Sequence, residues 1–333
     1  MMVSVATPDV AASGDQWIPV SVHARIEEAQ GVVSLDLRAV QALPAFEAGA
    51  HIDLLLPTPQ GPLMRQYSLC NDPRETHRYV VGVGFDANGR GGSRWIHESL
   101  TVGQTLQVGR PRNHFPLAET APKNVLIAGG IGVTPLLAMA RRLSAIGAPW
   151  TLYYCVRTPE RAAFLDVLRA LPGRVIPVFD GEPGVTGLDI AALARAEAPD
   201  THLYCCGPAP MMQAFGLAVR GRAPDTVHQE WFAAPAGDAA HAPSDGGFDV
   251  HLARSGHTVR VPPDRSILEV LSTQGIEVPF ACEQGVCGSC ETRVLAGRCQ
   301  HRDLILSEAE RDANDRMLIC VSRCDGDSLT LDL

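Results

Sequence analysis

The stretch that decides the fold is 124–135, which reads NVLIAGGIGVTP. Its apolar run 124–128 is typical of a short buried strand, the glycines that follow indicate a tight turn, and the run Pro135–Ile146 predicts a helix. The same alternation continues downstream, where we expect strands at 150–156, 174–179 and 201–205, and helices at 160–170, 187–196 and from Pro210 onward. Strands and helices that alternate in this way predict a parallel sheet with helices on both faces.

Upstream of this region the pattern changes to short alternating runs broken by glycine and proline. The segments 32–37, 51–56 and 79–85 are examples, and such runs are typical of an antiparallel β barrel or sandwich. Residues 1–16 carry Pro, Gly, Ser and Asp without periodicity, which predicts a disordered leader.

Downstream, the segment 233–247 is rich in Ala, Pro, Gly, Asp, His and Ser and lacks an apolar period, which predicts a linker. After it we expect a hairpin made of 248–252 and 258–261, and then a helix over 266–274. The chain is therefore expected to be multidomain: a leader (1–16), a β-barrel domain (17–118), an α/β domain (119–232), the linker (233–247) and a small C-terminal domain (248–333).

The amino-acid composition argues against several classes of partner. The 333 residues carry a formal charge of −9, which argues against a nucleic acid partner because phosphate binding needs a basic surface. No stretch approaches the ~20 apolar residues of a membrane span, and the N-terminus lacks the features of a secretory signal. Ten cysteines in such a chain favour metal ligation or reduced thiols over disulfides, and we expect a cytoplasmic protein with no membrane partner.

Four cysteines are spaced like metal ligands, in the pattern C-x4-C-x2-C followed by a distant fourth residue: Cys282, Cys287, Cys290 and Cys320. Four thiolates, two for each iron, hold a [2Fe–2S] cluster, and this is the plant-type spacing. Gly285 and Gly288 lie inside the loop, where left-handed dihedrals are inexpensive only for glycine. The alternatives are a chance spacing and zinc, which usually takes two C-x2-C pairs where this chain has one. Cys299 and Cys324 fall outside the spacing and are expected to be structural.

The loop around these cysteines resembles a known family. Residues 280–290, FACEQGVCGSC, are similar to the cluster loop of plant-type ferredoxins. The resemblance covers the last ~85 residues and implies an α+β, β-grasp fold there, with the four cysteines as ligands.

A second motif lies in the β-rich part. Residues 65–69, RQYSL, match the R-x-Y-S signature of the ferredoxin reductase superfamily. The resemblance implies a flavin site in which Arg65 meets the phosphate, Tyr67 lies beside the ring and Ser68 lies near N5, where hydride arrives. Alone the motif occurs by chance in strands; its position before a nucleotide-binding pattern strengthens it.

The glycine-rich segment 89–93, GRGGS, can cradle a terminal phosphate with backbone N–H groups. It is similar to the corresponding segment of the phthalate dioxygenase reductase family, which implies FMN instead of FAD. The candidate contacts are Gly91, Gly92 and Ser93. The alternative is a solvent-exposed loop.

The turn 129–135 follows a strand and opens a helix, so its glycines can let the backbone approach a pyrophosphate at the helix N-terminus. Its pattern, G-x-G-x-x-P, departs from the Rossmann fingerprint, and the alternative is a plain strand-to-helix turn. The candidate nicotinamide-binding residues here are Gly129, Gly130, Gly132, Thr134 and Pro135.

Two more segments support a nicotinamide domain. Residues 206–212, CGPAPMM, resemble the superfamily segment that closes over the nicotinamide, and 230–232, EWF, resemble the E-x-F ending whose aromatic ring lies over the flavin. The resemblance implies further cofactor-binding residues: Cys206, Gly207, Pro208, Met211 and Phe232. It also implies Ser68, Cys206 and Glu230 as the groups near the hydride path, with Cys206 a neutral thiol. The alternative for Phe232 is an ordinary core residue.

Discrimination between NADH and NADPH depends on the loop that starts at Arg157. Arg157 and Arg161 could meet a 2′-phosphate, whereas Glu160 could repel one. The family resemblance favours NADH over NADPH.

The domain order resembles that of the phthalate dioxygenase reductase and vanillate demethylase reductase family. This implies a reductase that passes electrons from NADH through FMN and a [2Fe–2S] cluster to a separate Rieske-type oxygenase. One alternative is the reductase of a diiron or haem monooxygenase, although many of those carry the ferredoxin at the N-terminus; another is a non-catalytic redox sensor. Residues 248–333 carry 14 acidic and 9 basic side chains, which predicts a basic docking patch on the partner.

Overall fold

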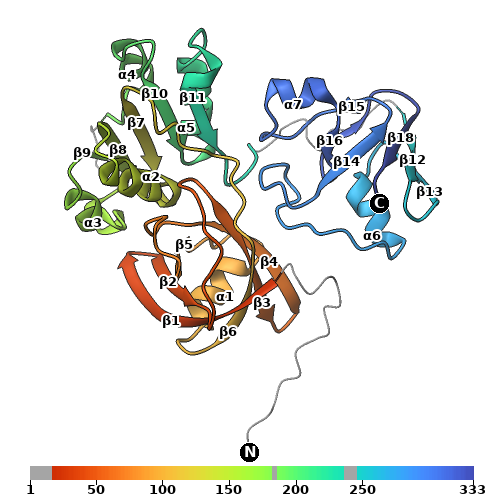
Figure 1. Ribbon diagram of the computed structural model, residues 1–333, viewed down its shortest axis with the longest axis horizontal. Helices are drawn as coiled ribbons and strands as arrows, with labels where there is room; N and C mark the ends of the chain where they lie inside the picture. The colour runs from red at the N-terminus through yellow and green to blue at the C-terminus, as the bar shows by residue number, and fades with distance from the viewer. Residues whose placement is uncertain (1–16, 182–185, 236–245) are drawn as a thin grey trace, which may run out of the picture.

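The computed structural model describes residues 17–181, 186–235 and 246–333. The predicted leader and most of the predicted linker lie outside these residues. Within them the chain forms an antiparallel β domain, a parallel α/β domain and a C-terminal domain with a mixed sheet (Figure 1). No helix of the described residues is long and apolar enough to cross a membrane.

The N-terminal domain is an antiparallel sheet with strand order β4-β3-β6-β1-β2-β5. A bridge between Leu69, directly after β4, and Val81 of β5 joins the two edges, so the sheet closes into a barrel around an apolar core. The elements are β1 (Trp17–Ala29), β2 (Val32–Arg38), β3 (His51–Thr58), β4 (Gly61–Ser68), β5 (Tyr79–Gly84), α1 (Gly92–Glu98) and β6 (Thr105–Gly109).

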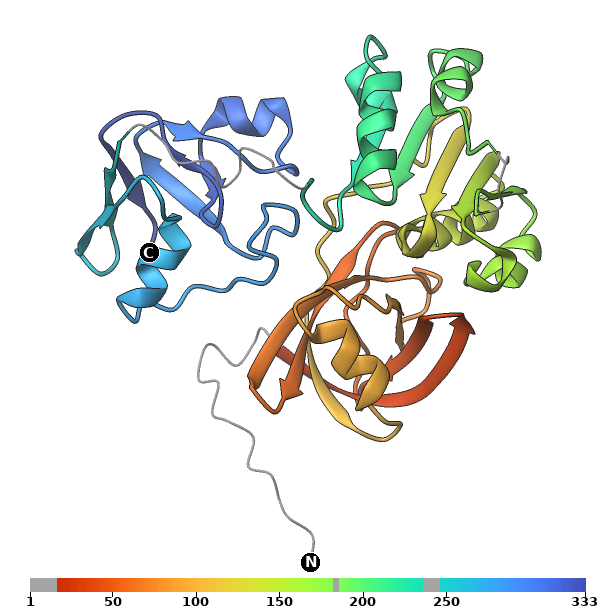
Figure 2. The ribbon, with the colours of Figure 1, turned by 180° about the vertical axis from the view of Figure 1, so that it is seen from behind.

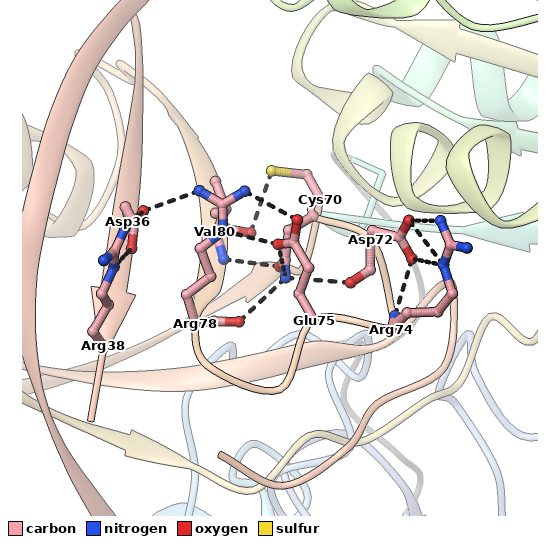
Figure 3. Close-up of polar contacts among 9 residues, drawn as sticks. Asp36, Arg38, Cys70, Asp72, Arg74, Glu75, Arg78 and Val80 are labelled. Atoms are coloured by element: carbon pink, nitrogen blue, oxygen red, sulfur yellow. Dashed lines mark hydrogen bonds and ion pairs between the residues drawn. The ribbon is translucent and has the colours of Figure 1, made fainter. Parts of the chain in front are cut away.

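A polar network holds the chain between β4 and β5 (Figure 3). Asn71 is its centre: its side chain accepts from the Val80 N–H at 2.9 Å and donates to the Arg78 carbonyl and to the Glu75 carboxylate. Arg78 donates to both Glu75 and Asp36, which ties the connection to β2. The network therefore fixes the exit of β4, the strand that carries the R-x-Y-S motif.

The second domain is a parallel sheet with strand order β11-β10-β7-β8-β9. Side chains of β7 alternate between its faces: Leu126 and Ala128 pack against α2, and Val125 and Ile127 pack against α4 and α5. Helices thus cover both faces, as the sequence predicts. The elements are β7 (Asn124–Gly129), η1 (Gly130–Gly132), α2 (Val133–Ala145), β8 (Trp150–Val156), η2 (Pro159–Arg161), α3 (Leu165–Arg169), β9 (Arg174–Phe179), α4 (Ile190–Ala196), β10 (His202–Cys206), α5 (Ala209–Ala218), η3 (Pro224–Thr226) and β11 (Val227–Glu230).

The continuous helix predicted over 160–170 is wrong. The chain instead forms the short η2 and α3, with Phe164 between them in the left-handed region at φ 61°. Phe164 is buried in the core beneath α2, and its ring lies close to Gly82 of the barrel. Burial of this ring between two domains outweighs local helix propensity. The helix predicted from Gly187 begins only at Ile190, because Asp189 caps it by accepting from the Ala192 N–H.

The C-terminal domain has the strand order β13-β12-β18-β14-β16, in which β12 and β18 are parallel and the other pairs are antiparallel. Capping boxes open both of its α-helices: Ser266 with Glu269, and Ser307 with Glu310. The elements are β12 (Phe248–Leu252), β13 (Thr258–Val261), α6 (Ile267–Thr273), β14 (Glu291–Ala296), β15 (Cys299–Gln300), α7 (Glu308–Ala313), β16 (Arg316–Leu318), β17 (Arg323–Cys324) and β18 (Ser328–Leu331).

The expected hairpin of β12 and β13 and the helix after it are confirmed. The loop between α6 and β14, which contains three of the candidate metal ligands, turns toward the other two domains in both ribbon views (Figures 1 and 2).

Candidate functional site

A cleft of about 400 Å³ lies where the three domains meet, a volume in the range of small-molecule sites. Residues predicted from separate motifs line it together: Arg65, Tyr67, Ser68, Gly92, Ser93, Thr134, Glu230, Phe232, Cys282 and Cys287. The remaining candidates are not among the lining residues of the cleft: Gly91, Gly129, Gly130, Gly132, Pro135, Cys206, Gly207, Pro208, Met211, Cys290 and Cys320.

Strand β4 delivers the R-x-Y-S residues to the cleft. Arg65 donates to the Arg90 carbonyl at 2.9 Å, so it ties the strand to the glycine-rich segment 89–93. Gly92 allows this approach, because a Cβ there would lie 2.7 Å from Cγ of Arg65. Burial and the nearby Arg90 charge lower the pKa of Arg65. A bound phosphate would supply a negative charge that stabilises the protonated guanidinium of Arg65 here.

A polar pair lies deeper in the cleft. The Ser68 hydroxyl donates to Oε2 of Glu230 at 3.4 Å, which joins the end of β4 to the end of β11. Burial raises the pKa of Glu230 to about 8, although the Ser68 hydrogen bond acts in the opposite direction. Burial, with Glu230 and Cys205 nearby, also raises the pKa of Cys206 well above its ordinary value. At neutral pH this end of the cleft is therefore lined by a protonated carboxyl, with the neutral thiol of Cys206 buried behind it.

The glycine turn and the segment after β10 pack directly against each other. A Cβ at Gly132 would overlap the carbonyl oxygen of Cys206, and one at Gly129 would lie 2.5 Å from Cδ of Pro208. Thr134 is buried in the first turn of α2, where its hydroxyl donates to the Ile131 carbonyl. The turn winds through η1 directly into α2, so the helix begins two residues before the predicted Pro135.

Phe232 lines the cleft with 42% of its surface exposed, so it is not a core residue. It directly follows the buried Trp231 after the end of β11. An exposed ring over a cleft is available to stack on a planar ligand.

The four candidate metal ligands converge although one of them is remote in the sequence. The Cys282 sulfur is in hydrogen-bond contact with those of Cys287 and Cys320, and Cys320 is in turn in contact with Cys290. Iron binds cysteine as the thiolate, and these four thiols are close enough to one another to bind a shared metal group. All four side chains are buried. Among the described residues, no three His, Cys, Asp or Glu side chains are grouped to hold a single ion. The sulfurs of the four cysteines instead lie in contact in pairs, without disulfide bonds.

The loop around the cluster cysteines has the backbone that the sequence predicts. Gly285 and Gly288 adopt φ values of 69° and 74°. The Gln284 N–H points at the Cys282 sulfur at 3.3 Å, a donor that stabilises a ligating thiolate. A set of thiols of this kind fits an iron–sulfur cluster. Cys299 and Cys324 face each other across β15 and β17, outside this group of sulfurs.

Sequence reasoning missed a group of polar residues beside the cluster loop: His51, Asp53, Gln66, Arg112 and Ser289. Asp53 and Arg112 form an ion pair, and His51 is 5% exposed in the wall of the cleft. Burial, together with the Arg112 charge, lowers the pKa of His51 to about 3, so its ring is neutral. The available signal was a charged residue within the otherwise apolar run of β3, where Asp53 lies between Ile52 and Leu54.

Two domain families match the chain. Residues 126–216 match an oxidoreductase NAD-binding domain, and residues 250–325 match a 2Fe-2S iron-sulfur cluster binding domain. The chain is 49% identical over 95% of its length to the phenoxybenzoate dioxygenase subunit beta of Ectopseudomonas oleovorans, covering 98% of that protein. It is 44% identical over 94% of its length to a vanillate O-demethylase oxidoreductase of Pseudomonas putida, again covering 98%.

Among solved structures, phthalate dioxygenase reductase, described as a modular structure for electron transfer from pyridine nucleotides to [2Fe-2S], matches with a TM-score of 0.69 and 38% identity. That match covers 95% of this chain and 98% of the other. The chain belongs to the phthalate dioxygenase reductase and vanillate demethylase reductase family. It is an oxidoreductase that transfers electrons from a nicotinamide nucleotide through a flavin to a [2Fe–2S] cluster.

This reductase unit also occurs inside a larger protein. An intact type IV self-sufficient cytochrome P450 monooxygenase matches with a TM-score of 0.84 and 39% identity over 95% of this chain. The chain spans about two fifths of that protein, 41% of its length.

Proposed function

We propose that this chain is the NADH-dependent reductase component of a two-component Rieske-type oxygenase, with electrons passing from NADH to FMN, to the [2Fe–2S] cluster and on to the oxygenase. One observation carries the proposal: a single cleft is lined at once by the R-x-Y-S strand, by Glu230 and Phe232, and by the cluster cysteines Cys282 and Cys287. An electron carrier in this cleft would have the nicotinamide domain on one side and a cluster ligand on the other.

The flavin, when bound, accepts a hydride and releases its electrons one at a time, which is the chemistry that the protein itself cannot supply. The protein contributes position and polarity. In this proposal the Ser68 hydroxyl and the protonated Glu230 carboxyl are hydrogen-bond donors beside the edge of the flavin that accepts hydride. The neutral thiol of Cys206 lies behind them. The exposed ring of Phe232 covers the cleft until a nicotinamide takes its place.

The positive charge around segment 89–93 favours FMN. Arg65 and Arg90 lie close enough for the Arg90 charge to lower the pKa of Arg65, so a phosphate monoester would be bound by two guanidinium groups and by the backbone of Gly91, Gly92 and Ser93. We also propose the domain boundaries 17–118, 119–232 and 248–333, so that each cofactor has its own domain.

A carboxylate at the end of β9 favours NADH over NADPH. Arg157, one of the two arginines that could meet a 2′-phosphate, lies 3.9 Å from the Asp180 carboxylate. A 2′-phosphate would therefore meet a negative charge beside the arginine, in addition to that of Glu160. In this proposal a ribose hydroxyl is accepted here and a phosphate is rejected.

A haem monooxygenase is the second candidate for the electron acceptor. The likeness to a self-sufficient P450 supports it, because there the same reductase unit, with a C-terminal ferredoxin, is part of a haem enzyme. The names of two relatives, a dioxygenase subunit at 49% identity and a demethylase oxidoreductase at 44%, support the Rieske-type oxygenase. We propose a cytoplasmic location, where NADH is available.

The test combines cofactor analysis with turnover. Acid extraction should release FMN, and iron analysis should give about two irons per chain. NADH should support cytochrome c reduction better than NADPH; a fully loaded protein that shows no turnover would support a redox sensor instead. Reduction of a purified Rieske-type oxygenase, but not of a P450, would decide between the two acceptors. FAD in the extract, or a preference for NADPH, would contradict the corresponding part of the proposal.

A further inference from the structure

The side chain of Ser289, in the cluster loop, is bound by residues of the β barrel. Its hydroxyl oxygen accepts from Nε2 of Gln66 at 2.8 Å and from Nη2 of Arg112 at 3.2 Å, and it donates to Oδ1 of Asp53 at 3.4 Å. One hydroxyl of the C-terminal domain therefore meets three side chains that are more than 170 positions away in the sequence.

The barrel residues that bind Ser289 are also bound to one another. Asp53 and Gln66 are directly paired across β3 and β4, and Nε2 of Gln66 donates to Asp53 at 2.5 Å. Arg112 donates two hydrogen bonds to the Asp53 carboxylate, and its backbone pairs with that of His51. Asp53 is only 4% exposed. A bidentate pair is geometrically specific, and this one is only partly open to salt because the Asp53 side chain is 6% exposed and that of Arg112 is 31% exposed.

A second contact between the same domains is of a different kind. Arg90 and Glu283 form an ion pair whose side chains are 43% and 48% exposed. Exposed ion pairs contribute little to stability, and salt screens the attraction between their charges. The group around Ser289, which is built on the buried carboxylate of Asp53, is therefore the contact that can fix the position of the loop.

Ser289 lies between two of the cluster ligands. Its oxygen is 3.5 Å from the sulfur of Cys287, and Cys290 is the next residue. Close packing surrounds it: a Cβ at Gly288 would lie 2.6 Å from Nε2 of His114, and the Cys287 backbone lies against the buried ring of His51. Cys287 also lines the cleft, so any movement of Ser289 moves a cluster ligand relative to the cleft.

We propose that Asp53, Gln66 and Arg112 form a clamp on Ser289 that holds the cluster loop against the flavin cleft and so sets the rate of electron transfer from flavin to cluster. The residues act through the position of Ser289: Asp53 and Arg112 do not line the cleft, and Gln66 lines it while its amide holds Ser289. This inference rests on the proposed function, because it places the electron donor in the cleft.

The test compares Ser289→Ala with the matched control Ser255→Ala, which removes an exposed hydroxyl from the hairpin between β12 and β13. Both holoproteins are mixed with NADH anaerobically, and flavin and cluster reduction are followed separately. Ser289→Ala should reduce its flavin at the wild-type rate and its cluster several-fold more slowly, since the rate of electron transfer falls as the distance between the two carriers grows. Ser289→Thr, which keeps the hydroxyl, should restore most of the rate.

A second readout does not depend on turnover. Amide hydrogen exchange in segment 282–290 should rise in Ser289→Ala and stay unchanged in Ser255→Ala, because the loop loses its anchor on the barrel. Arg112→Lys, on the barrel side, should raise exchange in the same segment, because a lysine cannot reproduce the bidentate contact. This variant keeps the test valid if Ser289→Ala fails to hold its cluster.

Unchanged exchange and an unchanged internal rate in both variants would overturn the clamp. Failure of the proposed function has a different signature, since the wild-type protein would then lack flavin or iron.

Discussion

At the scale of single residues, the polar pair Ser68 and Glu230 defines the reacting end of the cleft. Folding raises the pKa of Glu230 from an ordinary value near 4.5 to about 8 through burial. Between these two pH values the folded protein holds a proton that the unfolded chain lacks. Folding stability therefore falls as the pH rises through this window.

We predict that Glu230→Gln removes this pH dependence, because the amide is a neutral isostere of the protonated acid. The melting temperatures of variant and wild type should be similar near pH 5, and the variant should become relatively more stable up to about pH 8, by on the order of 3 kcal/mol. Thermal denaturation across this range checks it. Parallel curves for the two proteins would show that Glu230 is ionised in the folded state.

Gly92 provides a second prediction at this scale. Gly92→Ala places a Cβ 2.7 Å from Cγ of Arg65, close to the backbone, where the side chain cannot easily give way. Arg65 should be displaced, and the purified protein should retain less flavin. The control is Gly216→Ala in α5, where nothing lies within 4 Å, so this substitution should leave flavin content unchanged and stabilise the helix slightly. Equal flavin content in both variants would argue against Arg65 as a phosphate ligand.

The sequence predicted the residues of the individual motifs because their chemistry is local. Cysteine spacing indicates a cluster whatever surrounds it, and the left-handed Gly285 and Gly288 follow from the same loop. The contact between Ser68 and Glu230 joins residues 162 positions apart, and the raised pKa depends on burial by the whole cleft. Neither the contact nor the burial can be derived from local composition.

At the scale of elements, the connection between β4 and β5 determines how firmly the R-x-Y-S strand is held (Figure 3). Asn71 is 2% exposed and satisfies both the N–H of Val80 and the carbonyl of Arg78. Buried backbone groups that lose their partner cost about 1–3 kcal/mol each. The integrity of the connection thus depends on one amide side chain.

We predict that Asn71→Ala lowers the melting temperature of the barrel by several degrees, because the Val80 N–H and the Arg78 carbonyl, both in partly buried residues, lose the Asn71 side chain as partner. Arg74→Ala is the matched control: it removes an arginine that pairs with Asp72 and is 65% exposed, a type of pair worth about 0–1 kcal/mol. Calorimetry of both variants checks the difference. Equal losses of stability would mean that the network is held by its surface charges instead.

The sequence predicted helices and strands correctly where the local preference of the chain agrees with its tertiary packing. Strands β7, β8, β9 and β10 were predicted within one residue at each end, because uninterrupted apolar runs have no competing structure. The helix expected over 160–170 was wrong because Phe164 is drawn into a core shared with the barrel. The sequence of residues 160–170 alone does not show that Phe164 is buried against another domain.

At the scale of the whole molecule, function depends on three domains that meet at one cleft. Each domain was recognisable separately, but the network of Asp53, Gln66 and Arg112 around Ser289 joins segments that no local pattern connects. The C-terminal domain carries 14 acidic and 9 basic side chains. Its outward surface therefore favours a basic partner.

We predict that electron transfer from this protein to its oxygenase slows as ionic strength is raised, since exposed charges are screened beyond a Debye length of about 8 Å at physiological salt. Stopped-flow reduction of the oxygenase at low and high salt checks this. Reduction of the reductase itself by NADH is the control and should change little. An oxygenase reduction rate indifferent to salt would exclude electrostatic docking.

The proposed electron path needs one chain that holds both a two-electron carrier and a four-thiolate cluster. Anaerobic titration with NADH, followed by visible and EPR spectra, measures this directly. The wild-type protein should take up about one and a half NADH per chain, since the flavin accepts two electrons and the cluster one, and Cys320→Ser should take up about one and lose the cluster signal. Uptake of only one NADH by the wild type, or an unchanged spectrum in Cys320→Ser, would contradict the account.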